Sequence, residues 1–495
     1  MFYMKRQMTD FQNTSVRPSF RLLSQDQIEE FHRSTLELLE KAGIRVLHPE
    51  ALDLLQKNGC TVKDGKMVFF PGWLVEECIR SAPSRITIYD RLGKEAMRLE
   101  GRNSYFGTGT DLISTVDQQT RRARPSCLQD VINAAWVADA CPEIDFIASF
   151  GLPREVPINS MYLRNFKILI ENSTKPIFFT AAGKEDLEYI LDIAGIVAGG
   201  DDLLQEKPFL IHYSEPTPPR SQSIGAVNKL FICAQRLIPI CYTPAAMLGG
   251  SAPVTLAGGI VQTNAEALSG LVIHQLKHKG APIISGVAAT PFDMRAATVT
   301  YGTPDQRLTN SAFSDLYHYY GLPMWSTAAS DSHCLDEQAA MEYAFSTLMA
   351  ALDGANLIHD IGYLGQGLLG DPAALVMADE IISYVRRIMC GFDMDREHRA
   401  MDVISKVESG GNYLAERHTL KHFREELWMP KLANRDNPEA WEAKGALHYS
   451  DRARQKTKEI LASFKPKPLP HEVQLRIDEI FCQAESILKK IDFAA

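Results

Sequence analysis

The stretch 321-GLPMWSTAASDSHCLDEQAAMEYAFSTLMAAL-352 contains the unit from which the fold is predicted. A short apolar run ends near Trp325, small and polar residues follow it, and a long helical pattern comes next. This is the order of a buried strand, a loop and a covering helix. Ser332 or Asp336 is the expected N-cap, because these side chains accept hydrogen bonds from first-turn N–H groups. Alternatively, residues 331–334 form a catalytic or metal-binding cluster.

The same unit recurs along the chain. Strand-like runs lie at residues 103–110, 144–153, 175–183, 207–216, 238–247, 281–290, 322–330 and 355–364, and each precedes a stretch of helical periodicity. Alternating strands and helices predict an α/β fold with a parallel sheet. Eight units over about 270 residues indicate a closed TIM (β/α)₈ barrel, with helical additions at both ends. A doubly wound open sheet is the alternative, although no strand is followed by a GxGxxG or P-loop motif.

The chain is expected to divide into three regions. Residues 1–100 form a helical N-terminal extension, 101–375 form the barrel, and 376–495 form a helical C-terminal region. Within the first region, a helix is predicted at 25–43, capped by a serine, and a hairpin at 61–70.

Composition excludes several classes of protein. The 495 residues are 45% hydrophobic and 23% charged, as in a globular protein with a large core. A net charge of −9 argues against nucleic-acid binding. No apolar run reaches the ~18 residues of a membrane span, and the first residues lack a signal-peptide core. The nine scattered cysteines contain no CxxC pair, which fits reduced thiols and a cytoplasmic location. We expect no metal site.

In such a barrel the chemistry lies where the strands end. Tyr213 and Glu215 are the candidates for orienting a substrate. The candidate substrate-binding residues are Phe106, Phe179, His212, Tyr242, Phe292, Arg295, Trp325, His359 and Tyr363. Successive strand residues point to opposite faces, so His212 and Tyr213 cannot both face the interior. Several aromatic rings around one opening suit a quaternary ammonium ion, which ring faces bind by cation–π attraction.

Four segments together resemble one known family. They are YTPAAMLGGSAPVTLAGGIVQTNAEALSG, GAPIISG, GLPMWSTAASDSHCLDEQAAMEYA and GANLIHDIGYLGQGLLG. The set is similar to the trimethylamine methyltransferase superfamily, and the resemblance runs from about residue 20 to about residue 420. It implies a TIM barrel that moves a methyl group from a methylamine to the cobalt of a separate corrinoid protein.

Some family members carry pyrrolysine in the loop after the seventh strand, near Ala329 here. This sequence has ordinary residues in that loop: Ala329, Ser330, Asp331, Ser332 and His333. The resemblance therefore implies the branch without pyrrolysine, which acts on quaternary amines. Glycine betaine, giving dimethylglycine, is the favoured donor, and proline betaine, carnitine and γ-butyrobetaine are the alternatives. Arg295, His212 or His359 would hold the substrate carboxylate.

The resemblance also implies partners. Corrinoid (cobalamin) would be supplied by a cognate corrinoid protein, with no cofactor bound tightly to this chain. Apart from the resemblance, we expect the chain to form a homo-oligomer. Two other functions stay open. One is a non-catalytic barrel that binds or senses a betaine, and the other is a zinc-dependent corrinoid methyltransferase for methanol or thiols.

Overall fold

A computed structural model describes residues 15–286 and 288–490 of the chain. Its centre is a parallel sheet of seven strands, which are β10 (Ile177–Phe179), β11 (Leu210–Ser214), β13 (Ile240–Tyr242), β15 (Ile283–Gly286), β18 (Met324–Thr327), β19 (Leu357–Ile361) and β7 (Tyr105–Thr108). Parallel bridges from Gly107 to Phe146 and from Ile147 to Ile177 supply the eighth position and close the ring. The predicted barrel is confirmed, and the open sheet is excluded.

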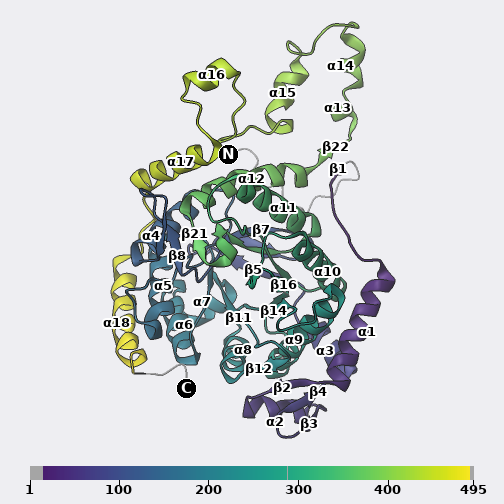
Figure 1. Cartoon of the computed structure of the whole chain (residues 1–495), viewed down its shortest axis with the longest axis vertical. Coiled ribbons are helices and arrows are strands. Elements are labelled where there is room, and N and C mark those ends of the chain that lie inside the picture. Colours follow the sequence, from purple (N-terminus) through teal and green to yellow (C-terminus); the bar gives the residue numbers. More distant parts are fainter. Residues whose placement is uncertain (1–14, 287, 491–495) are drawn as a thin grey trace.

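A helix follows each of the eight strand positions (Figure 1). These helices are α4 (Leu128–Ala140), α5 (Ile158–Asn172), α6 (Lys184–Ala198), α8 (Ile224–Arg236), α9 (Leu256–Lys277), α10 (Pro304–Tyr320), α11 (Glu337–Asp353) and α12 (Pro372–Cys390). A short helix, α7 (Asp201–Glu206), follows α6. Asp336 accepts a hydrogen bond from the Ala339 N–H and is the N-cap of α11, as one of the two predicted candidates.

The N-terminal region combines helices with two small sheets. Its elements are α1 (Gln25–Lys41), β2 (Ile44–Val46), α2 (Pro49–Lys57), β3 (Thr61–Lys63), β4 (Met67–Phe69), α3 (Gly72–Ser81), β5 (Ile86–Tyr89) and β6 (Glu95–Leu99). Ser24 caps α1 in a capping box with Gln27, as predicted. β12 (Ser221–Gln222) joins β2, β4 and β3 in one sheet. Both α1 and α3 pack against α9.

The hairpin of β5 and β6 closes the amino-terminal end of the barrel. The Tyr89 N–H donates to the carbonyl of Pro208, at the start of β11, and Arg91 N–H donates to Thr174 O near the start of β10. Ile86, Ile88, Met97 and Leu99 form one buried cluster with the side chains inside the barrel. The interior is therefore a packed core at this end, and only the opposite end is available to ligands.

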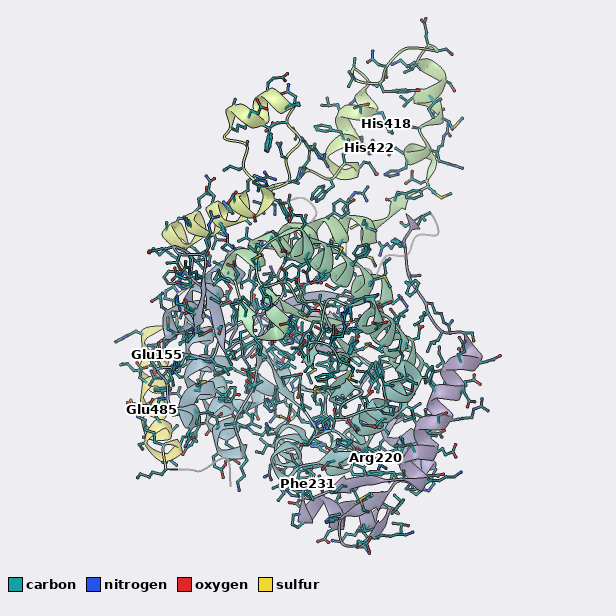
Figure 2. All side chains as sticks on the ribbon, in the orientation of Figure 1. Glu155, Arg220, Phe231, His418, His422 and Glu485 are labelled. Atoms are coloured by element: carbon teal, nitrogen blue, oxygen red, sulfur yellow. The ribbon has the colours of Figure 1, made fainter. Side chains whose placement is uncertain are left out.

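The C-terminal region leaves the barrel and returns to it. The short helices α13 (Arg396–Arg399), α14 (Met401–Lys406), α15 (Arg417–Glu426) and α16 (Pro438–Ala443) project away from the barrel (Figure 1). The segment that precedes these helices contains β22 (Phe392–Asp393), which pairs with β1 (Ser15–Val16). α17 (Tyr449–Ser463) then packs on α12 and α4, and α18 (His471–Leu488) packs on α5 and α6. Figure 2 places Glu485, which pairs with Arg164 of α5, on α18.

We predict that the β5–β6 hairpin, which plugs the amino-terminal end of the barrel and is called the hairpin plug below, contributes strongly to stability. Ile88 is fully buried, so Ile88→Ala should lower the free energy of unfolding by about 2–5 kcal/mol, because it leaves a cavity beneath the barrel. Ile158 is 72% exposed, so the matched Ile158→Ala should change it by less than about 0.5 kcal/mol. Urea unfolding followed by circular dichroism measures both. Equal losses in the two variants would show that the plug is not a structural element of the core.

Candidate active site

The carboxyl end of the barrel, called the mouth below, is covered by two small sheets built from the loops. One contains β8 (Ser114–Val116), β9 (Ala123–Pro125), β20 (Tyr363–Leu364) and β21 (Leu369–Gly370), from the loops after β7 and β19. The other contains β14 (Ala245–Leu248), β16 (Ala288–Asp293) and β17 (Thr298–Val299), from the loops after β13 and β15. A 3₁₀ turn, η1 (Gly365–Gly367), separates β20 from β21. Loops held by pairing can position side chains more rigidly than free loops.

An aromatic cluster lies beneath the mouth. Its members are Phe146, Phe178, Tyr213, Trp325, His359 and Tyr363. The His359 ring is central, with its centroid 4.6 Å from that of Phe178, 6.1 Å from that of Trp325 and 6.4 Å from that of Tyr363. Tyr213 stacks near Trp325, at 6.2 Å and an interplanar angle of 26°. The cluster presents ring faces within the spacing of favourable aromatic pairs.

Three carboxylates, from Asp111, Glu215 and Asp360, stand at the mouth beside these rings. Asp111 Oδ1 accepts from the hydroxyls of Thr110 at 3.0 Å and Thr180 at 3.3 Å, which links the ends of β7 and β10. Glu215 accepts from the Tyr213 hydroxyl. Asp360 accepts from the Thr327 hydroxyl, and its Oδ1 lies 2.8 Å from His359 Nδ1. We call this set the mouth carboxylates.

Two of the mouth carboxylates sit on unusual backbone. Asp111 has a φ of 65° and Asp360 a φ of 72°, both in the left-handed region. Such a conformation costs of order 1 kcal/mol or more for a residue other than glycine, although aspartate tolerates it better than most. The left-handed turn at the end of β7 and within β19 fixes where each carboxylate points.

The environment of Asp111 and Glu215 disfavours the negative charge of these two carboxylates. Burial raises the pKa of Asp111, while hydrogen bonds from Thr110 and Thr180 oppose that rise. Surrounding protein also raises the pKa of Glu215, and the charges of Asp111 and Asp360 raise it further. The Glu215 side chain is nevertheless exposed, so it lies in a recess that solvent can reach. A cation bound there would relieve this repulsion.

His359 Nε2 and Trp325 Nε1, inside the barrel, lack hydrogen-bond partners among the residues that the structure describes, on side chains that are 1% and 2% exposed. His359 Nδ1 also makes no hydrogen bond, although it lies 2.8 Å from Asp360 Oδ1. Buried polar atoms are nearly always paired in proteins, so an unpaired one at a mouth indicates a place for a ligand atom or a water molecule. Both rings belong to the aromatic cluster.

The structure separates the sequence-predicted residues into three groups: one at the mouth, one in the β16–β17 hairpin and one facing the surrounding helices. Tyr213, Glu215, Trp325, His359 and Tyr363 come together at the mouth. Tyr363 is held there because its hydroxyl donates to Thr110 O and accepts from Thr110 N–H. Phe292 and Arg295 lie instead in the β16–β17 hairpin. The Arg295 side chain is 92% exposed and pairs with Asp293, so it points away from the barrel.

Four of the predicted binding residues face the surrounding helices, which corrects the prediction. The Phe106 ring lies under Arg386 of α12, and the Phe179 ring is 5.3 Å from that of Phe166 in α5. His212 packs on Phe179 at 4.9 Å. The Tyr242 hydroxyl donates to Gln222. Strand alternation places each of these residues outside the barrel wall, so none of them lines the interior.

The loop after β18 is held by its own hydrogen bonds. Ala329 and Ser330 are fully buried, and the Ser330 hydroxyl donates to Glu342 at 2.7 Å. Asp331 accepts from the N–H groups of Tyr301 and Gly302. The Ser332 hydroxyl donates to Asp336, and His333 is exposed. These contacts account for residues 330–332 as loop and cap structure, which favours the capping interpretation of 331–334. Their role beside a substrate stays a prediction.

Residues missing from the prediction include Phe146, Phe178, Asp111 and Asp360. Phe178 faces inward and its neighbour Phe179 outward, and the sequence shows that one of the two faces inward but carries no signal for which one. Asp360 stands at the mouth beside His359 because its left-handed backbone interrupts the alternation of β19. Phe146 lies at the shortest strand position, where two bridges alone define the strand.

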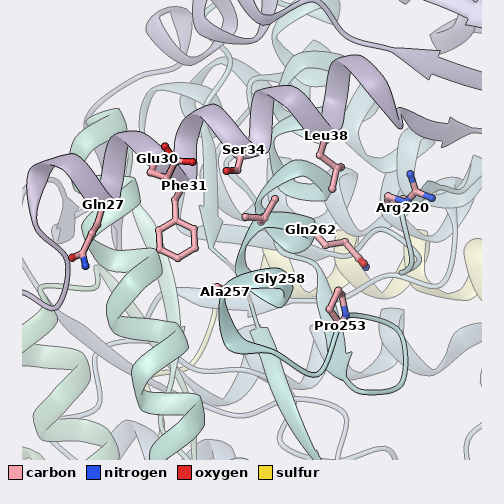
Figure 3. A pocket seen from close by; sticks show the side chains of 11 residues that line it. Gln27, Glu30, Phe31, Ser34, Leu38, Arg220, Pro253, Ala257, Gly258 and Gln262 are labelled. Atoms are coloured by element: carbon pink, nitrogen blue, oxygen red, sulfur yellow. The ribbon is translucent and has the colours of Figure 1, made fainter.

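A separate groove lies between α1 and α9, with a volume of about 530 Å³ (Figure 3). Phe31 and Leu38 of α1 face Ala257 and Gly258 of α9 across it, and Arg220 lies at one end. None of its lining residues belongs to the aromatic cluster or to the mouth carboxylates. The groove is a feature of the outer helical layer.

Residues 15–286 and 288–490 contain neither a metal-binding cluster nor a membrane-spanning helix. No group of three or more His, Cys, Asp or Glu side chains there is arranged to hold a metal ion. In the same residues, no helix combines the length and apolarity needed to cross a membrane.

A closed barrel of eight parallel strands, with aromatic and acidic groups converging where the strands end, is the architecture of a (β/α)₈-barrel enzyme. The family model for trimethylamine methyltransferase (MTTB) matches residues 4–485. The chain belongs to the trimethylamine methyltransferase family and is a methyltransferase, which confirms the family and the enzyme class predicted from the sequence.

The proteins similar to this chain include both a trimethylamine methyltransferase and a glycine betaine methyltransferase. The chain is 32% identical to trimethylamine methyltransferase MttB of Desulfitobacterium hafniense (strain DSM 10664 / DCB-2), covering 93% of each chain. It is 30% identical to glycine betaine methyltransferase of Desulfitobacterium hafniense (strain Y51), covering 94% of this chain and 97% of the other. The crystal structure of Methanosarcina barkeri monomethylamine methyltransferase (MtmB) aligns over 89% of both chains, with a TM-score of 0.53 and 11% identity. That last likeness concerns the fold.

We predict that the mouth binds a small cation in a pH-dependent way. The pKa values of Asp111 and Glu215 are raised, so lowering the pH protonates them before it protonates ordinary carboxyl groups. Their negative charge, and with it cation affinity, is present at high pH and lost as pH falls through these values. Calorimetry should show tetramethylammonium binding about five- to tenfold more weakly at about pH 5 than at about pH 8. Glu215→Gln should flatten this dependence, and a pH-independent affinity in the unmodified protein would contradict it.

Proposed function

We propose that this chain transfers a methyl group from a quaternary amine to the cobalt of a corrinoid protein. The observation that carries the proposal is the aromatic cluster beneath the mouth carboxylates, in a barrel of the trimethylamine methyltransferase family. Ring faces and carboxylates both attract a trimethylammonium head, which has no N–H group to donate. A site that combines aromatic ring faces with carboxylates therefore suits the binding of a quaternary ammonium ion.

The chain's own residues would bind and orient the amine. Tyr213 and Trp325 would hold the ammonium against their ring faces, and Glu215 would balance its charge from the rim. Cobalt(I) of the partner's corrinoid would supply the nucleophile: a bond to the methyl carbon would form as the C–N bond breaks, and the tertiary amine would leave with its electron pair. Because the nitrogen leaves as a neutral amine, no proton transfer is needed, and the chain contributes orientation and desolvation.

The donor that the family comparison favours is glycine betaine, which would give dimethylglycine. Its support is the glycine betaine methyltransferase among the similar proteins. Proline betaine, carnitine and γ-butyrobetaine carry the same kind of ammonium head and are the alternatives. His359 is the one residue of the three predicted to hold a carboxylate that lies in the aromatic cluster.

Partners follow from the same proposal. A cognate corrinoid protein would bring cobalamin to the mouth, so this chain needs no tightly bound cofactor of its own. We also propose a homo-oligomer acting in the cytoplasm. All nine cysteines are free thiols, which fits a reducing compartment.

The proposal is tested by mixing the protein with free cob(I)alamin and a panel of amines, while the cobalt spectrum is recorded. Conversion to methylcobalamin with a quaternary amine is the expected result. Thermal stabilisation by the amine without any methylation would instead support a barrel that only binds or senses a betaine. Methylation from methanol or a thiol, together with stoichiometric zinc in the purified protein, would support the zinc-dependent alternative.

We predict that the two faces of the barrel wall respond differently to mutation. Tyr213→Ala removes a ring of the aromatic cluster and should lower kcat/KM for methyl transfer about tenfold or more, as expected for the loss of about 1–2 kcal/mol of cation–π attraction. Tyr213→Phe keeps the ring and should retain most of the rate. Phe106→Leu changes a buried residue outside the wall and should leave kcat/KM within about twofold. A larger effect of Phe106→Leu than of Tyr213→Ala would place the binding surface elsewhere.

A further inference from the structure

The mouth carries negative charge that the described part of the chain does not neutralise directly. Among residues 15–286 and 288–490, no lysine or arginine forms an ion pair with Asp111, Glu215 or Asp360. Their partners are hydroxyl groups, together with the His359 ring beside Asp360. Asp111 and Asp360, whose charges raise the pKa of Glu215, therefore stand near it without a basic side chain bonded to any of the three, although the charge of Lys229 lowers the pKa of Glu215.

The nearest basic side chains bond to backbone carbonyls, so their charges act on the mouth carboxylates without a direct bond: Lys229 lowers the pKa of Glu215, and Asp360 opposes the fall in the pKa of Arg307. Lys229 of α8 donates from Nζ to the carbonyl of Ala181 at 3.1 Å, behind the end of β10. Arg307 of α10 donates from Nη1 to Thr327 O at 2.6 Å and from Nη2 to Tyr301 O at 3.3 Å. The Arg307 side chain is buried, so its charge supports the loop carbonyls and does not face solvent in the mouth. Arg295 points outward, as described above.

The mouth carboxylates affect two parts of a quaternary amine. One is the ammonium head, and the other is the substituent that distinguishes one amine from another, called the tail below. The ammonium head is attracted by all three mouth carboxylates. A carboxylate one carbon from the nitrogen would be brought close to the same three groups, and like charges held together in a partly buried site repel strongly. A basic side chain aimed into the mouth would be required to offset this repulsion.

The unpaired ring nitrogens indicate what the tail can contain. Trp325 Nε1 is a neutral donor, and His359 Nε2 is a donor or an acceptor according to the tautomer. Each can form a hydrogen bond with a neutral hydroxyl group or a water molecule, which adds no negative charge beside the mouth carboxylates. A short uncharged tail, with or without a hydroxyl group, therefore fits both the charge and the hydrogen-bonding groups of the site.

We infer that the mouth selects quaternary ammonium compounds with an uncharged tail over betaines whose carboxylate lies close to the nitrogen. The inference rests on the proposed function and narrows its substrate class. It departs from the donor that the family comparison favours, because similarity over the whole chain reports the shared barrel, whereas tail selection depends on the few charges at the mouth.

Choline and glycine betaine are the matched pair for the test. They share the trimethylammonium head and are similar in size, but one tail is a neutral alcohol and the other a carboxylate. With the full-length protein and cob(I)alamin, we expect kcat/KM for choline and for tetramethylammonium to exceed that for glycine betaine by about tenfold or more. Calorimetry with the same compounds, without cobalamin, should give the same order of affinities.

The charge dependence is tested with Glu215→Gln. Removing one mouth carboxylate should lower the ratio of kcat/KM for choline to that for glycine betaine about fivefold or more, whatever its effect on the absolute rates. Glu472→Gln, which removes an exposed carboxylate at the start of α18, is the matched control and should leave the ratio unchanged. A purely structural effect of Glu215→Gln would change both rates together and leave the ratio where it was.

The outcomes separate this inference from the proposed function. Methylation from glycine betaine as fast as from choline, or a ratio unchanged in Glu215→Gln, would overturn the inference and leave the methyltransferase proposal intact. No methylation from any quaternary amine would overturn the proposed function. The affinities measured by calorimetry would then be the test of whether the mouth binds choline more tightly than glycine betaine. Glycine betaine binding as tightly as choline would overturn the inference in that case too.

Discussion

The closure of the barrel at its second strand position is the constraint on which the rest of the structure depends. Two backbone pairings, Gly107 with Phe146 and Ile147 with Ile177, complete the ring. A Cβ atom at Gly107 would lie 2.1 Å from the Phe146 ring, so glycine is needed for this close approach. Once the ring closes, every strand has one face toward the interior and one toward the helices, and the aromatic cluster is assembled from strands far apart in the sequence.

The mouth then concentrates features that cost stability. Asp111 and Asp360 occupy left-handed backbone, three carboxylates stand near one another, and ring nitrogens of His359 and Trp325 are unpaired. Each of these would be unfavourable in an ordinary core, and the packed barrel and hairpin plug provide the stability that tolerates them. A bound cation would offset the carboxylate repulsion directly. The strain is thus located where a charged ligand relieves it, which is typical of binding sites.

Much of the fold was predictable because its signals are local. The eight runs of apolar residues, the helical periodicity after each of them and the caps at Ser24 and Asp336 can be read within windows of a few residues. The seventh unit, residues 321–352, shows the limit of such local signals. Its polar residues suggested a reactive cluster, but Ser330 and Asp331 are used to hold the loop, through Glu342 and the N–H group of Tyr301.

The sequence by itself determined the barrel, the family and the end of the strands at which the chemistry belongs. The tertiary structure alone decided which member of each neighbouring pair faces inward, so Tyr213 and Phe178 line the interior while His212 and Phe179 do not. The physical reason is that alternation along a strand has a known period but an unknown phase, and ring closure fixes that phase. The net charge of the mouth is likewise a tertiary property, because it is the sum of side chains from the loops after β7 and β11 and from β19 itself.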